Sequence, residues 1–122
     1  MNRYYKHIIF LTALFIFITG IIHGQVNQNS LLSSVQNYPN PFNPSTQIHF
    51  VLVKDAEVSI KIYNILGKEI VTLLDNKSLS AGQHLSEWNG KDKNGYSVSS
   101  GMYLYQVQAG TSVFTKKMSL LK

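Results

Sequence analysis

The stretch V-S-I-K-I-Y-N-I-L-G-K-E-I-V-T-L-L, residues 58–74, decides the fold. Its first six residues alternate apolar with polar or amphipathic side chains, a period of two that is typical of a strand with one buried face. Residues 64–68 then turn the chain, and Gly67 is able to adopt the positive φ that a tight turn needs. Because 69–74 is a second apolar run, the stretch predicts an antiparallel hairpin.

Similar strand-like runs occur on both sides of this hairpin. They are 48–53, 84–88, 102–109 and 113–121. Residues rich in Gly, Asn, Asp and Ser separate them, and we expect loops at 75–83 and 89–100. No segment has the apolar period of an amphipathic helix. Six or seven short strands with frequent turns predict an all-β fold, an antiparallel sandwich.

Aromatic residues mark the expected core. Trp88 ends a predicted strand. A position in the sandwich core explains this aromatic residue better than a role in stacking against a ligand does. Tyr103 and Tyr105 fall on one face of the strand 102–109, where core packing also explains them better than sugar or base stacking does. Phe42 and Tyr38 lie in a segment with three prolines and would be unusual residues to leave in water.

Four glycines fall where turns need a backbone conformation that other residues avoid. They are Gly67, Gly90, Gly95 and Gly101. Asn89-Gly90 and Asn94-Gly95 are dipeptides typical of tight turns. The run Asp92–Gly95 also resembles part of a calcium loop, but it lacks the further alternating oxygen ligands and the distal glutamate. We therefore interpret it as a turn.

The N-terminus has the build of a secretory signal peptide. Arg3 and Lys6 precede the apolar run 8–22, and Gly24 stands before the polar Gln25. We expect residues 1–24 to be removed between Gly24 and Gln25, with cleavage after Gly20 as an alternative. A retained membrane anchor is the competing interpretation, although a span needs about 20 apolar residues.

Residues 25–37 are polar and lack periodicity, so they predict a linker that leads into a domain at 38–122. Its first nine residues, Y-P-N-P-F-N-P-S-T, contain three prolines, each of which favours extended geometry in the residue before it. Asn40 and Asn43 are able to form Asx turns. We expect an irregular segment here, with Phe42 capping one end of the core.

Composition excludes several kinds of chemistry. The chain has no cysteine, which rules out disulfides, thiolate metal sites and a cysteine nucleophile. The formal net charge is +5, but beyond residue 24 nine lysines and six acidic residues leave +3, with no continuous basic stripe for nucleic acid. His49 and His84 have no third ligand near them in sequence. We expect no metal, no cofactor, no catalytic residue, no small-molecule substrate and no nucleic-acid partner.

The last strand allows two interpretations. Lysines at 116, 117 and 122 surround the apolar residues Met118, Leu120 and Leu121. In the first interpretation, this is a final edge strand whose lysines discourage pairing with another chain. In the second, it is a terminal element displayed to a partner, in which backbone groups give affinity and flanking charges give specificity.

Six short motifs carry a resemblance to a known family. They are Y-P-N-P-F-N-P-S-T at 38–46, I-Y-N-I-L-G-K-E at 62–69, L-S-A-G at 79–82, W-N-G-K-D-K-N-G at 88–95, S-S-G-M-Y-L-Y-Q-V at 99–107 and K-K-M-S-L-L-K at 116–122. In this order the chain resembles the type A C-terminal sorting domain of type IX secretion cargo. It is also similar to the Ig-like domain of flagellar hook-assembly proteins.

The resemblance implies a monomeric, non-catalytic, seven-stranded Ig-like sandwich that directs a protein from the periplasm across the outer membrane. It implies recognition by the translocon at the end of the domain, which we place at Lys116, Lys117, Met118, Leu120 and Lys122, and removal by a sortase. The expected location is the outer-membrane surface or the medium. Residues 25–37 are too short for a cargo, so the expected alternatives are a fragment of a larger gene, a free-standing sorting domain and a small surface protein. The alternative function is an Ig-like structural or binding module of a cell-surface or flagellar assembly.

Overall fold

The structure is a computed structural model, and it describes residues 30–122, so the expected leader and its cleavage site at Gly24 and Gln25 lie outside the described part. The described residues form seven strands. These are β1 (Leu32–Tyr38), β2 (Thr46–Leu52), β3 (Ala56–Asn64), β4 (Glu69–Leu79), β5 (Gly82–Trp88), β6 (Gly101–Ala109) and β7 (Ser112–Leu120). Residues 30–122 contain no helix long and apolar enough to cross a bilayer.

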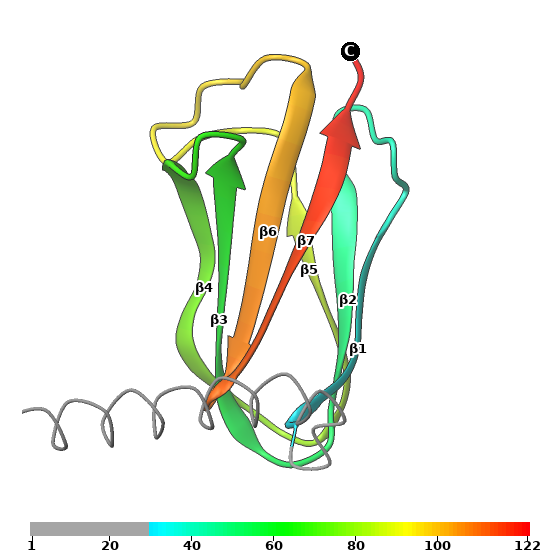
Figure 1. Ribbon diagram of the computed structural model, residues 1–122, viewed down its shortest axis with the longest axis vertical. Coiled ribbons are helices and arrows are strands. Elements are labelled where there is room, and N and C mark those ends of the chain that lie inside the picture. Colours follow the sequence, from blue (N-terminus) through cyan, green and yellow to red (C-terminus); the bar gives the residue numbers. More distant parts are fainter. Residues whose placement is uncertain (1–29) are drawn as a thin grey trace, which may run out of the picture.

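The strands form two sheets that face each other (Figure 1). One sheet has the order β1-β2-β5 and the other has the order β4-β3-β6-β7, with every neighbouring pair antiparallel. The all-β, antiparallel, Ig-like sandwich of seven strands is therefore confirmed, and so is the hairpin of β3 and β4.

The core lies between the two sheets and follows the period of two in the sequence. Ile48, Phe50 and Leu52 point inward from β2, and alternate residues of β3 and β6 point inward from the other sheet. The buried apolar residues are Leu32, Val35, Phe42, Ile48, Phe50, Leu52, Val58, Ile60, Ile62, Trp88, Tyr103, Tyr105, Val107, Ala109, Met118 and Leu120. The expected core positions of Trp88, Tyr103 and Phe42 are confirmed, whereas Tyr38 is 73% exposed.

The domain begins earlier than the sequence predicted. Residues 32–37 of the expected linker at 25–37 belong to β1, which pairs with β2 along its length. Only Leu32 and Val35 of β1 are buried, and a register shift between Leu32 and Ser34 separates them. The bulge spaces the two buried residues by three positions, so the strand lacks the alternation by which strands are recognised.

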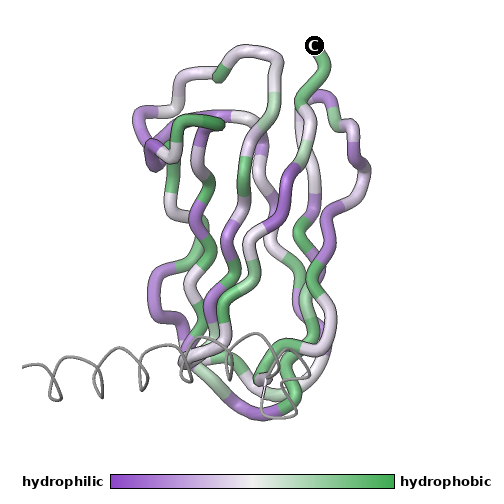
Figure 2. The backbone as a smooth tube through the Cα atoms, in the orientation of Figure 1, coloured by the Kyte–Doolittle hydropathy of each residue, from purple (hydrophilic) through white to green (hydrophobic). Residues whose placement is uncertain are grey.

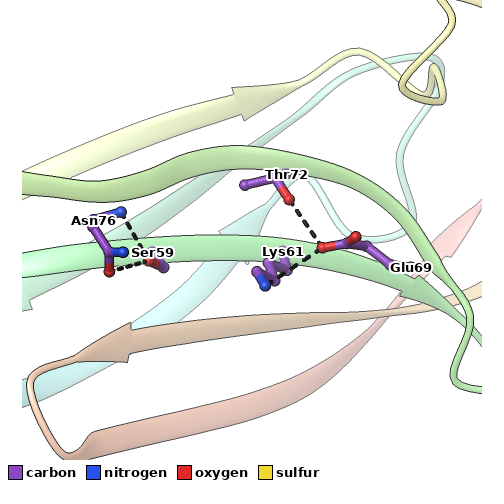
Figure 3. A network of polar contacts seen from close by, with 5 residues as sticks. All are labelled: Ser59, Lys61, Glu69, Thr72 and Asn76. Carbon is purple, nitrogen blue, oxygen red and sulfur yellow. Dashed lines mark hydrogen bonds and ion pairs between the residues drawn. The ribbon is translucent and has the colours of Figure 1, made fainter.

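The expected loop at 75–83 is also corrected, because β4 continues to Leu79 and β5 begins at Gly82. The polar residues at the end of β4 pair with β3 through their backbones, which requires no apolar side chain. Asn76 has a φ of 47°, and its backbone N–H donates to Ser59 Oγ at 2.9 Å (Figure 3). Three register shifts interrupt the pairing of β3 with β4, so this edge of the sheet is irregular.

The connections gather at two ends of the sandwich. The segment 39–45, the turn 64–68, the loop 89–100 and the C-terminus lie at one end, drawn at the top of Figure 1. The shorter connections 53–55, 80–81 and 110–111 lie at the other. We call these the C-terminal end and the opposite end.

Candidate functional site

The last strand, β7, forms one edge of the four-stranded sheet. Its nine residues pair with β6 from Ser112 to Leu120 without a register shift. This regularity contrasts with β4 at the other edge, whose pairing shifts three times. The edge position expected for the last strand is confirmed.

The proline-rich segment, Tyr38–Thr46, holds the end of β7. Phe42 N donates to Ser119 O at 2.9 Å, and Leu121 N donates to Phe42 O at 3.0 Å. Asn40 Oδ1 accepts a hydrogen bond from Ser119 N at 3.0 Å. The Asn40 side chain therefore serves a strand 79 residues away, whereas the sequence predicted a local Asx turn.

An aromatic cluster supports this contact from inside. The ring centroids of Phe42 and Trp88 lie 5.5 Å apart, and those of Trp88 and Tyr103 lie 5.2 Å apart in an edge-on arrangement. The polar atoms are satisfied, because Trp88 Nε1 donates to Lys91 O at 2.9 Å and Tyr103 Oη donates to Ser99 O at 2.6 Å. The proline-rich segment and the end of β7 thus lie over one packed aromatic cluster.

Two of the residues that we expected to contact a translocon are in the core. Met118 is 1% exposed and Leu120 is fully buried. A partner of the folded domain therefore does not reach these side chains. The alternation of Met118 and Leu120 could have indicated this, because residues two apart in a strand share a face.

The two adjacent lysines of β7 have different surroundings. Lys116 shares its face with Met118, and its Nζ donates to the backbone oxygen of Val35 in β1, in the other sheet. An inward-pointing charge is a common feature of protected sheet edges. Lys117 lies on the opposite, outward face. Lys122 follows the strand, and its backbone N donates to Ser100 Oγ at 3.0 Å.

The middle of β7 leaves backbone groups without a strand partner among the described residues. Ser119 directs its N–H and C=O away from β6, toward Asn40 and Phe42. In an antiparallel pair, alternate residues direct both groups to the same side. Val113, Thr115 and Lys117 therefore also point outward, and all three are exposed. We call these three residues the outer edge of β7.

All four turn glycines adopt positive φ: 84° for Gly67, 72° for Gly90, 84° for Gly95 and 151° for Gly101. Gly90 is also sterically restricted, because a Cβ there would lie 2.9 Å from Pro44 O. The turn at Asp92–Gly95 is confirmed. Asp92 Oδ1 accepts hydrogen bonds from Asn94 N at 2.9 Å and from Tyr96 N at 3.0 Å.

Among residues 30–122, the histidines are not part of a cluster of metal ligands. His49 and His84 both line a groove of about 260 Å³ whose other lining residues are uncharged. Their rings lie on opposite faces of the three-stranded sheet, because His84 pairs with the buried Phe50 and stacks on its ring at a centroid distance of 5.5 Å. Within residues 30–122, no three His, Asp or Glu side chains come together as metal ligands do. Burial raises the pKa of the Tyr105 phenol above its ordinary value of 10.0, while a backbone hydrogen bond with Asn37 acts in the opposite direction.

The sandwich, the proline-rich segment and the edge strand β7 define an Ig-like module. Residues 36–120 match the family described as the secretion system C-terminal sorting domain. Since this match covers well over half of the sequence, the chain belongs to that family. Among curated proteins, none matches the sequence.

Two solved structures share the fold. The first is a dimeric latent PorU from Porphyromonas gingivalis, with a TM-score of 0.61 and 21% identity, covering 71% of this chain and 9% of that protein. The second is PorZ, a surface component of the type IX secretion system of the same organism, with a TM-score of 0.51 and 21% identity, covering 73% of this chain and 12% of that protein. The chain thus spans only a small part of either protein's length.

The family establishes the class of function. The domain is a sorting signal of the type IX secretion system and belongs to a family of targeting domains rather than of catalysts. A protein that carries it is exported to the cell surface or the extracellular space.

Proposed function

We propose that the outer-membrane translocon of the type IX system recognises this domain by adding a strand to the outer edge of β7. The chain first reaches the periplasm by means of a leader at residues 1–24, which is cleaved between Gly24 and Gln25. After transport, a sortase separates the domain from what it has carried to the surface.

The observation that carries this proposal is the unpaired outer edge of β7. Val113, Thr115 and Lys117 direct their backbone groups away from β6, and β7 pairs with β6 without a shift over its whole length. A straight edge with unpaired donors and acceptors is the element to which an extended peptide adds. The irregular pairing of β4 makes the other edge of this sheet a poorer template, because bulges twist an edge away from a partner.

The two lysines then have separate roles. Lys117 lies on the outward face beside the added strand, where its charge affects encounter and specificity. Lys116 holds the β7 edge to β1 through the Val35 carbonyl and acts on stability instead. Met118 and Leu120 contribute as core residues that keep the edge straight.

Thr115 offers a sharp test of strand addition. Thr115→Pro removes one outward N–H without removing a backbone hydrogen bond between β6 and β7, and proline is tolerated at sheet edges where its nitrogen faces solvent. Thr115→Val keeps that N–H and serves as the matched control. A secreted passenger fused ahead of residues 30–122 is followed to the surface or medium of a type IX-competent host. We expect the proline variant to stay in the periplasm and the valine variant to be exported.

Circular dichroism of the purified proline variant must show an intact β-rich fold for this comparison to count. Normal export of a folded Thr115→Pro variant contradicts recognition through the outer edge of β7. If the unaltered fusion stays in the periplasm, the sorting function itself is contradicted.

Intact-mass measurement tests the two cleavage steps. Material from the periplasm should begin at or near Gln25, whereas retention of residues 1–24 in a membrane fraction supports an anchor instead. A passenger recovered from the cell surface should lack residues 30–122. A surface passenger that keeps them contradicts sortase removal and leaves recognition by the translocon unaffected.

A further inference from the structure

Two turns of the same build stand side by side at the C-terminal end. In the first, Asn64 Oδ1 accepts hydrogen bonds from Leu66 N at 3.0 Å and Lys68 N at 2.9 Å. In the second, Asp92 Oδ1 accepts the equivalent bonds from Asn94 N and Tyr96 N. In both, the fourth residue is a glycine whose N–H donates to the carbonyl of the first. Each tip therefore has a defined conformation.

The second turn is tied to the strand that follows the first. Lys93 N donates to Ile70 O at 3.1 Å, close to the start of β4. The loop and the β3–β4 turn accordingly lie next to each other at the same end of Figure 1. The two tips form one surface, which we call the turn surface: Ile65, Leu66, Lys68, Lys91, Lys93 and Tyr96.

The turn surface exposes apolar side chains that contribute nothing to the core. Leu66 is 89% exposed, Ile65 is 61% exposed and Tyr96 is 71% exposed. Figure 2 shows the β3–β4 tip as a hydrophobic segment at the same end as the hydrophobic C-terminus. Turn positions are ordinarily occupied by polar residues or glycine, so an isoleucine and a leucine here are not explained by folding.

Lysines surround these apolar tips. Lys68, Lys91 and Lys93 are all exposed, and Lys122 belongs to the same end. Of the nearby carboxylates, Asp92 is bonded to backbone N–H groups and Glu69 faces Lys61 at 3.6 Å, while Glu87 lies on the other sheet. The net charge at the opposite end has the other sign, because Lys54 and Lys77 are outnumbered there by the acidic residues Asp55, Glu57 and Asp75.

We propose that the turn surface docks on the anionic face of a phospholipid bilayer. Ile65 and Leu66 enter the boundary between head groups and acyl chains, Tyr96 lies at head-group level, and the lysines contact the lipid phosphates. Short apolar tips beside basic residues suit such an interface, because binding combines buried apolar area with attraction to anionic lipids.

Docking at this end leaves the outer edge of β7 accessible, since that edge runs along the side of the sandwich. The inference therefore does not rest on the proposed recognition by the translocon. It places the exported domain on a membrane surface, with β7 standing upright from it.

Vesicle flotation with the exported protein tests the proposal. Vesicles of phosphatidylethanolamine with phosphatidylglycerol are compared with vesicles of phosphatidylcholine alone at low salt. We expect binding to the anionic vesicles, about tenfold weaker for Ile65→Ser/Leu66→Ser because the inserted apolar area is lost. Lys68→Gln/Lys93→Gln should weaken binding about thirtyfold, as removal of two charges near the surface predicts.

Matched controls carry the same chemical changes elsewhere on the surface. Val53→Ser/Leu85→Ser removes two exposed apolar side chains away from the turn surface, and Lys54→Gln/Lys77→Gln removes two charges at the opposite end. Both should bind as the unaltered protein does. Absence of binding, or equal losses in test and control variants, overturns the proposal. Normal vesicle binding by the Ile65→Ser/Leu66→Ser variant overturns it too. If the unaltered protein binds no vesicles and this variant is not exported, the tip contacts a protein instead, and the proposal is also overturned.

Discussion

Phe42 forms a parallel bridge with Leu120, so one residue of the proline-rich segment holds the last residue of the last strand. The bridge joins the proline-rich segment to the end of the domain at one place. It also limits what a partner reaches, because Ser119 and Leu121 have their outward backbone groups occupied by Asn40 and Phe42. The unpaired part of the edge is therefore the middle of β7.

The first prediction concerns this bridge. Phe42→Ala should lower the free energy of unfolding by about 3–5 kcal/mol, because a buried ring is lost beside Trp88 and a cavity remains. Urea denaturation of the purified domain measures the change. Tyr38→Ala is the matched control, since it removes an exposed ring from the same segment and should change the free energy of unfolding little. Similar losses in the two variants would contradict the role given to Phe42.

Much of the fold could be predicted because a strand with one buried face leaves a period of two in the sequence. Ile48, Phe50 and Leu52 show it, and so do the inward residues of β3 and β6. β1 escaped prediction because its bulge places Leu32 and Val35 three residues apart. The end of β4 escaped prediction because residues with polar side chains pair through their backbone groups as readily as residues with apolar side chains do.

The candidate site was harder to predict, since its contacts join residues far apart in sequence. Nothing near Asn40 indicates that its side chain accepts a bond from Ser119, and nothing near Lys116 indicates the carbonyl of Val35. The burial of Met118 and Leu120, in contrast, was available from alternation alone. The basic residues around them led to a functional interpretation of side chains that serve the core.

The second prediction separates two turn glycines. Gly95→Ala should cost about 1 kcal/mol, because its φ of 84° is unfavourable for other residues although the space beside it is open. Gly90→Ala should cost about 2 kcal/mol or more, because a new Cβ also meets Pro44 O at 2.9 Å. Thermal melting checks both, with Lys93→Ala as an exposed control that should not shift. Equal losses at the two glycines would refute the steric part of the argument.

The third prediction concerns alkaline pH. The pKa of Tyr105 is raised in the folded state, mainly by burial, so the folded protein holds this proton more tightly than the unfolded chain does. The stability that this provides is fully present below pH 10 and is lost as the pH rises through the folded-state pKa. Denaturant midpoints measured above pH 10 should therefore fall more steeply for the native sequence than for Tyr105→Phe. Parallel curves would show that Tyr105 titrates normally.

The fourth prediction places the start of the functional domain at Ser30 rather than at Tyr38. Residues 32–37 supply Leu32 and Val35 to the core, and burying each such side chain contributes about 1.5–3 kcal/mol. A chain that starts at Tyr38 loses β1, leaves the β2 edge unpaired and removes the carbonyl that Lys116 contacts.

We therefore expect a passenger fused to residues 30–122 to be exported and one fused to residues 38–122 to stay in the periplasm and be degraded. Circular dichroism should show a cooperative melt for the longer domain alone. Val35→Ser within the longer domain should also lower its stability. Because this variant keeps the full length, it separates the loss of β1 packing from the effect of a shorter spacer. Identical melting of the two lengths would mean that β1 does not belong to the folding unit.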